Sequence, residues 1–170
     1  MRWRRERPPA DAVAALGPGE GVVSWADTSD GAVVLATQRG IWWPDDGGYR
    51  LIGWQYVTKA TWQDDVLSVI EGDVTDDGLI VDLPVVRAQL TTPRDLPPAI
   101  RKRVEQNIVK RELVRVDGGA VRFVGRRVPG EDRVQWWARL EPGTPPTADV
   151  LSAVQARLVR LADEWAVTSC

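Results

Sequence analysis

The spacing of turn signals between residues 20 and 83 limits the fold of this chain more than any other feature. Short runs of β-branched and aromatic residues alternate there with clusters of Asp, Ser and Gly, such as Asp27–Gly31 and Asp76–Gly78. A turn signal recurs about every ten residues, which is typical of an antiparallel meander that curls into a barrel or sandwich. The predicted strands are 22–26, 32–37, 41–43, 49–52, 55–62, 66–70 and 79–83.

The pattern changes at the proline-rich segment 93–98. Asp95 can cap a helix, and apolar residues then recur every four positions, which predicts an inserted helix near 96–108. Strands are predicted again at 112–117, 120–128 and 133–140. A second helix follows Pro146, because apolar residues step by three and four there. Its apolar stripe consists of Leu151, Val154, Leu158, Leu161 and Trp165.

This order of elements predicts an α+β fold. We expect an antiparallel β-barrel or sandwich of pleckstrin-homology-like plan, by analogy of topology, with the inserted helix and a C-terminal amphipathic helix. The C-terminal helix is expected to pack over the open end of the barrel. Residues 1–19 are interpreted as a basic N-terminal arm with a short helical turn over 11–16, and residues 20–166 as a single domain.

The residue inventory argues against an enzyme. The chain of 170 residues contains no His, which is the commonest general base and a common metal ligand, and its one Cys is the last residue, Cys170. It has no GxSxG motif, no P-loop and no dinucleotide fingerprint. The Asp pairs at 45–46, 64–65 and 76–77 are interpreted as turn residues. We therefore expect no catalytic residue, no metal site and no cofactor.

Nine Trp residues require a separate interpretation. Trp25, Trp54 and Trp62 lie in apolar runs and are predicted to be core residues. Two adjacent pairs also lie in predicted strands, where neighbouring side chains point to opposite faces. One ring of each pair should therefore face outward, either as part of an interface or covered by a helix or the N-terminal arm. These pairs are Trp42 with Trp43 and Trp136 with Trp137.

The near-neutral net charge of −2 conceals a strong asymmetry. Residues 20–85 carry 3 basic and 12 acidic groups, a net charge of −9, whereas residues 86–139 carry 13 basic and 6 acidic groups, a net charge of +7. Three interpretations remain open: a phosphate-binding patch for nucleic acid or lipid, a complementary surface for a protein partner or a second copy, and internal neutralisation.

We favour the second and third interpretations together, which predicts a non-enzymatic protein-interaction or assembly module with a protein partner or self-association. The alternatives are a nucleic-acid-associated factor that uses the basic region 101–127, and a peripheral membrane or lipid-binding module. No transmembrane segment is predicted. The candidate interaction surface comprises Trp42, Trp43, Trp136, Trp137, Arg101, Arg103, Arg126 and Arg127.

Several segments carry a family resemblance. Residues 19–26, 34–42, 52–62, 100–109 and 118–130, together with Trp136, resemble an uncharacterised conserved actinobacterial protein family. The resemblance spans most of residues 10–165. It implies the fold, a bacterial source and a cytoplasmic location, and it assigns no catalytic or binding residue. The absence of a disulfide pair also favours the cytoplasm.

Overall fold

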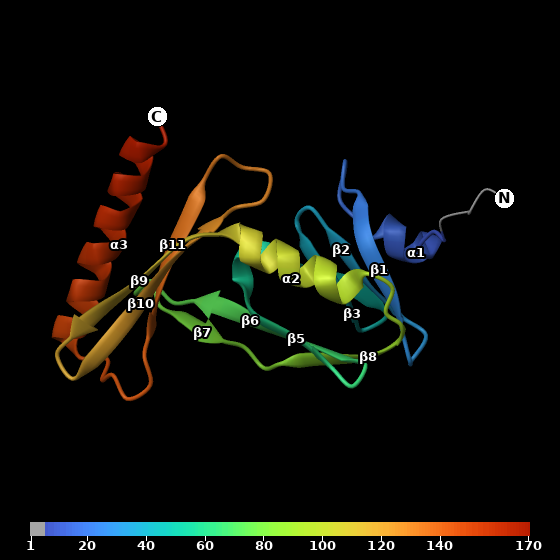
Figure 1. Ribbon diagram of the computed structural model, residues 1–170, viewed down its shortest axis with the longest axis horizontal. Helices are drawn as coiled ribbons and strands as arrows, with labels where there is room; N and C mark the ends of the chain where they lie inside the picture. Colours follow the sequence, from blue (N-terminus) through green and yellow to red (C-terminus); the bar gives the residue numbers. More distant parts are fainter. Residues whose placement is uncertain (1–5) are drawn as a thin grey trace.

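The computed structural model describes residues 6–170 and has an α+β architecture with two antiparallel sheets (Figure 1). The strands of the first sheet are β1 (Val22–Thr28), β2 (Val33–Thr37), β3 (Gly40–Asp45), β4 (Gly48–Gly53), β5 (Val57–Gln63), β6 (Val66–Val74), β7 (Ile80–Asp82) and β8 (Val86–Thr92). The strands of the second sheet are β9 (Ile108–Val116), β10 (Gly119–Arg127) and β11 (Val134–Leu140). The helices are α1 (Ala10–Ala14), α2 (Leu96–Asn107) and α3 (Ala148–Thr168), and η1 (Trp54–Tyr56) is one 3₁₀ turn.

The first sheet is strongly curled and forms a half-barrel. Its strands follow the order β4-β3-β2-β1-β8-β6-β5, and β7 pairs with the end of β6. The edges of the half-barrel are therefore β4 and β5. Tight turns set the registers: the β5–β6 hairpin turns at Asp64 and Asp65, both with positive φ, as a two-residue loop of primed type requires.

Helix α2 fills the half-barrel. It contacts β1, β2, β5 and η1, and its apolar stripe buries Leu96 and Ile100 against the inner face of the sheet. Trp54 completes this core, where its indole Nε1 donates a hydrogen bond to the Thr37 carbonyl oxygen at 2.9 Å. Asp95 precedes the helix and accepts a hydrogen bond from the Ser24 hydroxyl at 2.5 Å. The inserted helix is thus the element that closes the barrel core.

The second sheet has its own core against α3. The strands follow the order β11-β10-β9, and the apolar face of α3 packs on it through Val150, Val154 and Leu161. Thr147 caps α3 by accepting a hydrogen bond from the Val150 amide at 3.2 Å. The sheet contributes Val121 to the same cluster. Figure 1 shows α3 along the outer side of this sheet, away from the half-barrel.

The two sheets meet along β7 and β11. Leu79 and Ala138 form a parallel bridge, and the Ala138 amide donates a hydrogen bond to the Gly78 carbonyl oxygen at 3.0 Å. The rings of Tyr56 and Trp137 stack across the junction at a centroid distance of 5.9 Å. Polar and aromatic contacts therefore hold the sheets together in addition to the continuous chain from α2 into β9.

The predicted α+β class, the antiparallel strands and both long helices are confirmed. One strand was missed and one expectation was wrong. Strand β8 was not predicted, although it joins β1 to β6 and makes the half-barrel continuous. The helix that fills the half-barrel is α2 rather than the C-terminal helix, because α3 packs on the second sheet. Residues 1–5 of the predicted basic arm lie outside the described residues.

Candidate interaction surface

The paired tryptophans do not form an exposed surface. One ring of each pair is buried, Trp43 at 6% and Trp137 at 3% exposure, as the alternation along a strand requires. The outward ring of Trp42 packs against the cluster of Ala12, Val33 and Leu35, which joins α1 to β2. The outward ring of Trp136 meets Trp165 of α3 edge to face, with centroids 6.1 Å apart. Trp43 and Trp137 are therefore buried and leave the candidate interaction surface, whereas Trp42 and Trp136 are half-buried against neighbouring elements.

A carboxylate anchors the half-buried Trp42. The indole Nε1 of Trp42 donates to Glu20 at 2.8 Å, and Arg39 and Thr37 donate to the same carboxylate. Burial raises the pKa of Glu20, but these hydrogen bonds, led by the one from Trp42, outweigh it and hold the pKa below its ordinary value. Glu20 is thus a structural acid that fixes the covered ring.

Two other tryptophans depart from the predicted core. Trp62 on β5 is 38% exposed, so its prediction as a core residue was wrong. Trp25 is half-buried and lies under the guanidinium of Arg94, 3.5 Å from the ring centroid. Arg94 is itself held by Glu6 and Asp27 at 2.6 and 2.9 Å. Trp54 alone of the three is fully buried as predicted.

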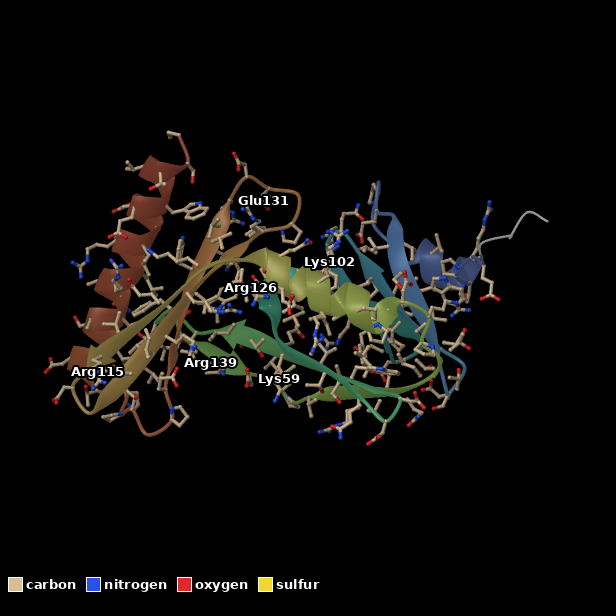
Figure 2. The ribbon with its side chains drawn as sticks, in the orientation of Figure 1. Lys59, Lys102, Arg115, Arg126, Glu131 and Arg139 are labelled. Carbon is tan, nitrogen blue, oxygen red and sulfur yellow. The ribbon has the colours of Figure 1, made fainter. Side chains whose placement is uncertain are left out.

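Arg126 lies inside the molecule rather than on its surface. It is 4% exposed, and Figure 2 shows it between the two sheets. Its Nε donates to Asn107 Oδ1 at 2.6 Å, and its Nη2 donates to the carbonyl oxygens of Trp54 at 2.6 Å and Val57 at 3.0 Å. Burial, with a smaller contribution from Arg111, lowers the pKa of Arg126 to about 10. Arg126 therefore connects the second sheet to the half-barrel.

The alternation along β10 points Arg126 toward the half-barrel, on the side of the sheet that carries Val124 and Trp137. The pairing of β10 with β9 is irregular between Gly125 and Arg126, and the ring of Trp136 lies where a side chain on Gly125 would be. Arg127, the next residue, is exposed, and its carbonyl oxygen accepts a hydrogen bond from Asn107 at 2.7 Å. Of the two adjacent arginines, only Arg127 remains available to a partner.

Cations without a carboxylate partner follow α2 and the strand that continues from it. Within residues 6–170, none of the six cations of this strip forms an ion pair within 4.0 Å. Arg103 is half-buried and the other five are exposed. Figure 2 shows Lys102 and Arg115 at widely separated points along it. We call this set the basic strip: Arg101, Lys102, Arg103, Lys110, Arg111 and Arg115.

Internal neutralisation is limited. Only two ion pairs join the basic segment 86–139 to the acidic segment 20–85 among the described residues: Arg94 with Asp27 at 2.9 Å, and Arg139 with Asp82 at 2.7 Å. The remaining ion pairs of the cations in this segment involve Glu6, Glu131 or Glu141, and its Glu112 pairs with Arg157. Most of the charge asymmetry of the sequence is therefore retained at the molecular surface.

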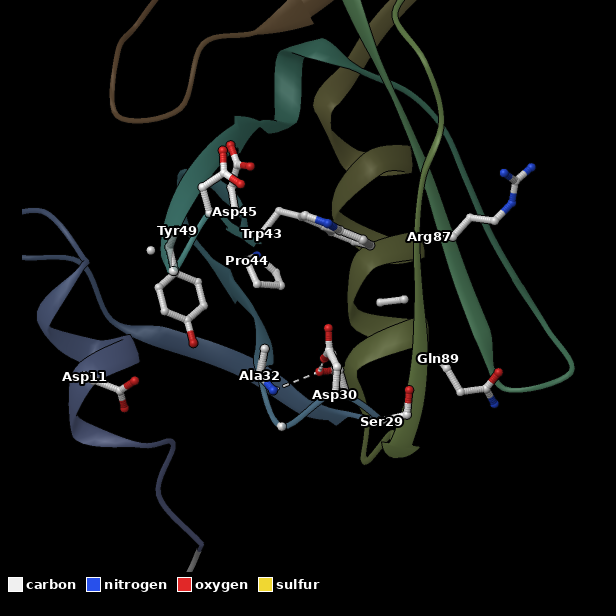
Figure 3. A pocket seen from close by; sticks show the side chains of 16 residues that line it. Asp11, Ser29, Asp30, Ala32, Trp43, Pro44, Asp45, Tyr49, Arg87 and Gln89 are labelled. Atoms are coloured by element: carbon white, nitrogen blue, oxygen red, sulfur yellow. Dashed lines mark hydrogen bonds between the residues drawn. The ribbon is translucent and has the colours of Figure 1, made fainter.

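Acidic side chains gather at a pocket of about 580 Å³ between α1, the β1–β2 and β3–β4 turns and β8 (Figure 3). Four carboxylates line it, from Asp11, Asp30, Asp45 and Asp46, with Arg87 on the opposite wall. The carboxylate of Asp30 accepts a hydrogen bond from the Thr28 hydroxyl, and this bond lowers the pKa of Asp30. Among residues 6–170, no three His, Cys, Asp or Glu side chains gather closely enough to hold a metal ion.

Comparisons of the chain with protein-family models, curated proteins and solved structures found no match. In the described part of the chain, every helix is too short or too polar to span a bilayer.

Proposed function

We propose that this protein is a non-enzymatic interaction module whose basic strip docks against an acidic surface of a protein partner. The observation that carries the proposal is the basic strip itself: six cations on two consecutive elements without a carboxylate partner. Glu105 is the one exposed acidic residue among these cations, and a surface with such an excess of one sign attracts a partner of the opposite sign and orients it during encounter. Glu112, the acidic residue within the strip's strand, is occupied by Arg157 at 2.6 Å.

The same charges have a second consequence for β9. Charged side chains on an edge strand oppose edge-to-edge pairing with another sheet. Lys110, Arg111 and Arg115 place such charges along both faces of β9. The partner surface is therefore expected to meet side chains of this strand rather than its backbone.

The half-barrel with α2 is proposed to be the pleckstrin-homology-like unit, since its strands are followed directly by the helix that fills it. Binding of anionic headgroups is disfavoured at the β1–β2 and β3–β4 turns, because Asp30, Asp45 and Asp46 line the pocket there. The proposal retains the cytoplasmic location that the family resemblance implies.

The test uses two double charge reversals of equal size. Lys110→Glu with Arg115→Glu alters the strip, whereas Arg87→Glu with Arg160→Glu alters exposed cations elsewhere that also lack an ion pair. Tagged full-length proteins are used for capture from nuclease-treated lysate of cells that express the protein. The strip variant should lose a partner that the wild type and the control retain, with affinity at least about tenfold weaker.

Nucleic acid is the competing ligand for the same cations. Labelled duplex and single-stranded DNA and RNA are therefore titrated in parallel at several salt concentrations. Binding that falls steeply with salt and disappears in the strip variant would replace the protein partner with nucleic acid. Equal capture by both double variants would remove the strip from the interaction.

A further inference from the structure

We infer that β5 accepts an extended segment of a partner protein as an added strand, in a groove between β5 and the first turns of α2. The segment would carry an apolar side chain and an Asp or Glu two residues apart, on the face that meets α2. This site uses a different edge of the molecule from β9, so it goes beyond the basic strip, with which it shares only Arg101.

The backbone of β5 is unpaired on one side. Strand β5 is an edge of the half-barrel and pairs only with β6. Within residues 6–170, no backbone–backbone hydrogen bond outside the β5–β6 pairing involves residues 58–63. A row of unpaired amides and carbonyls is the template to which an extended peptide adds.

The hairpin geometry identifies which backbone groups are available. Gln63 and Val66 flank the two-residue turn, so they form a hydrogen-bonded pair, and pairs alternate from there along the ladder. Trp62 and Ala60 therefore occupy the positions that are not hydrogen-bonded to β6. Their N–H and C=O groups point to the free edge.

A groove runs beside this edge. It has a volume of about 600 Å³ and lies between the end of β5 and the start of α2. Its apolar walls include Trp62, Leu67, Pro97 and Ile100. Ala60 packs toward the barrel core, and Trp62, two residues further, shares that face of the strand. An apolar side chain of an added strand would thus lie between Trp62 and α2.

The charge of the groove lining indicates that the bound segment carries a carboxylate near its apolar side chain. The groove is lined by Arg94 and Arg101 and by no carboxylate. Glu6 and Asp27 already hold Arg94, whereas Arg101 is exposed and forms no ion pair with the described residues. A carboxylate two residues from the apolar side chain, on the same face of the added strand, is the group that complements Arg101. The segment 1–5 of this chain carries three Arg and no acid, so its charge opposes this site.

The edge also lacks the protection found on β9. Between Thr58 and Gln63 only Lys59 is charged, and Trp62 leaves 38% of its surface exposed at the rim of the groove. An edge with a single charge and an exposed aromatic ring is suited to pairing, and it is costly to leave bare. An added strand would cover the ring and satisfy the backbone together.

The experiment selects displayed random nine-residue peptides on the full-length protein and measures the enriched peptides by fluorescence anisotropy. We expect enriched peptides to carry a β-branched or aromatic residue and an Asp or Glu at positions i and i+2. Arg101→Glu and Trp62→Thr should each weaken binding by roughly tenfold or more. Arg160→Glu is the matched control, because it reverses an exposed cation outside both the groove lining and the basic strip and should alter affinity less than about twofold.

Amide hydrogen exchange provides the readout specific to strand addition. The amides of Ala60 and Trp62 should exchange rapidly in the free protein and become protected when peptide binds. Thr61, which pairs with β6, should already be protected. Three results would overturn the inference: no enriched peptide, peptides that bind both groove variants as tightly as wild type, or protection that leaves β5 unchanged. A protein that is dimeric until Trp62→Thr makes it monomeric would assign the edge to a second copy instead.

This test and the test of the basic strip can fail separately. If Trp62→Thr abolishes peptide binding while the double variant at Lys110 and Arg115 still captures the partner, the groove proposal is supported and the strip proposal is rejected. The reverse pattern would reject the groove alone.

Discussion

Replacement of Arg126 by Met should weaken the junction between the two sheets. The substitution removes hydrogen bonds to three oxygens: Asn107 Oδ1 at 2.6 Å, the Trp54 carbonyl at 2.6 Å and the Val57 carbonyl at 3.0 Å. The Trp54 carbonyl retains a bond from the Val57 amide, whereas the other two oxygens lose the guanidinium as donor. A buried acceptor left without a donor costs about 1–3 kcal/mol, so the two together give roughly 2–6 kcal/mol.

The lower part of that range is expected. Met also removes a charge whose burial is unfavourable, as the lowered pKa of about 10 indicates. We therefore expect Arg126→Met to reduce the free energy of unfolding by about 2–4 kcal/mol. Urea denaturation followed by tryptophan fluorescence and by far-ultraviolet circular dichroism measures the loss.

Arg127→Met is the matched control for this measurement. Arg127 is the adjacent residue, is exposed and forms no ion pair with the described residues, so its loss should change the stability by less than about 0.5 kcal/mol. A loss below about 1 kcal/mol for Arg126→Met, or equal losses for the two variants, would refute the role of Arg126 as a connection between the sheets.

Two further predictions concern an ion pair and a close approach. A hydrogen bond from Arg157 holds the pKa of Glu112 below its ordinary value of 4.5, so the stability it contributes is present above that value and is lost as pH falls through the folded pKa. Glu112→Gln should therefore make the free energy of unfolding fall less steeply between pH 5 and pH 3 in urea titrations than it does in wild type, and an identical slope would contradict this reasoning. A Cβ on Gly40 would overlap the Ile52 carbonyl oxygen across the β3–β4 pair, so Gly40→Ala should lower the thermal midpoint by many degrees, whereas Gly21→Ala, which has open space and no positive φ, should leave it within a few degrees.

Local signals were sufficient to predict most elements but not their partners. Turn residues marked β1 to β6 because hairpin loops impose backbone conformations that few residues adopt. Strand β8 carries a clear alternation of side chains from Val86 to Leu90, with Arg87 and Gln89 outward. It was missed because proline-containing segments border it on both sides. Its pairing with β1 depends on residues about sixty positions away, which no local pattern contains.

Burial of individual site residues was less predictable. The period of a strand predicts that one ring of Trp42 and Trp43 faces inward, but which one depends on the face that α1 covers. Arg126 and Arg127 are adjacent residues of the same type, so the local sequence does not show which of them is buried. Arg126 lies on the side of β10 that faces the half-barrel and reaches the carbonyl oxygens near Trp54, whereas Arg127 points to the other side, and no sequence motif marks this difference.

The pairing of β1 with β8 has a consequence for the order of folding. Asp27 lies opposite Thr92, so the half-barrel forms only after a long loop has closed, and α2 follows that loop in the chain. The second sheet consists of consecutive hairpins, whose contacts are close in sequence. During synthesis on the ribosome, strands β1 to β6 are therefore exposed without their filling helix until residue 107 has emerged. The chain has to remain unaggregated through that interval, and an unprotected β5 is the segment most exposed to premature pairing.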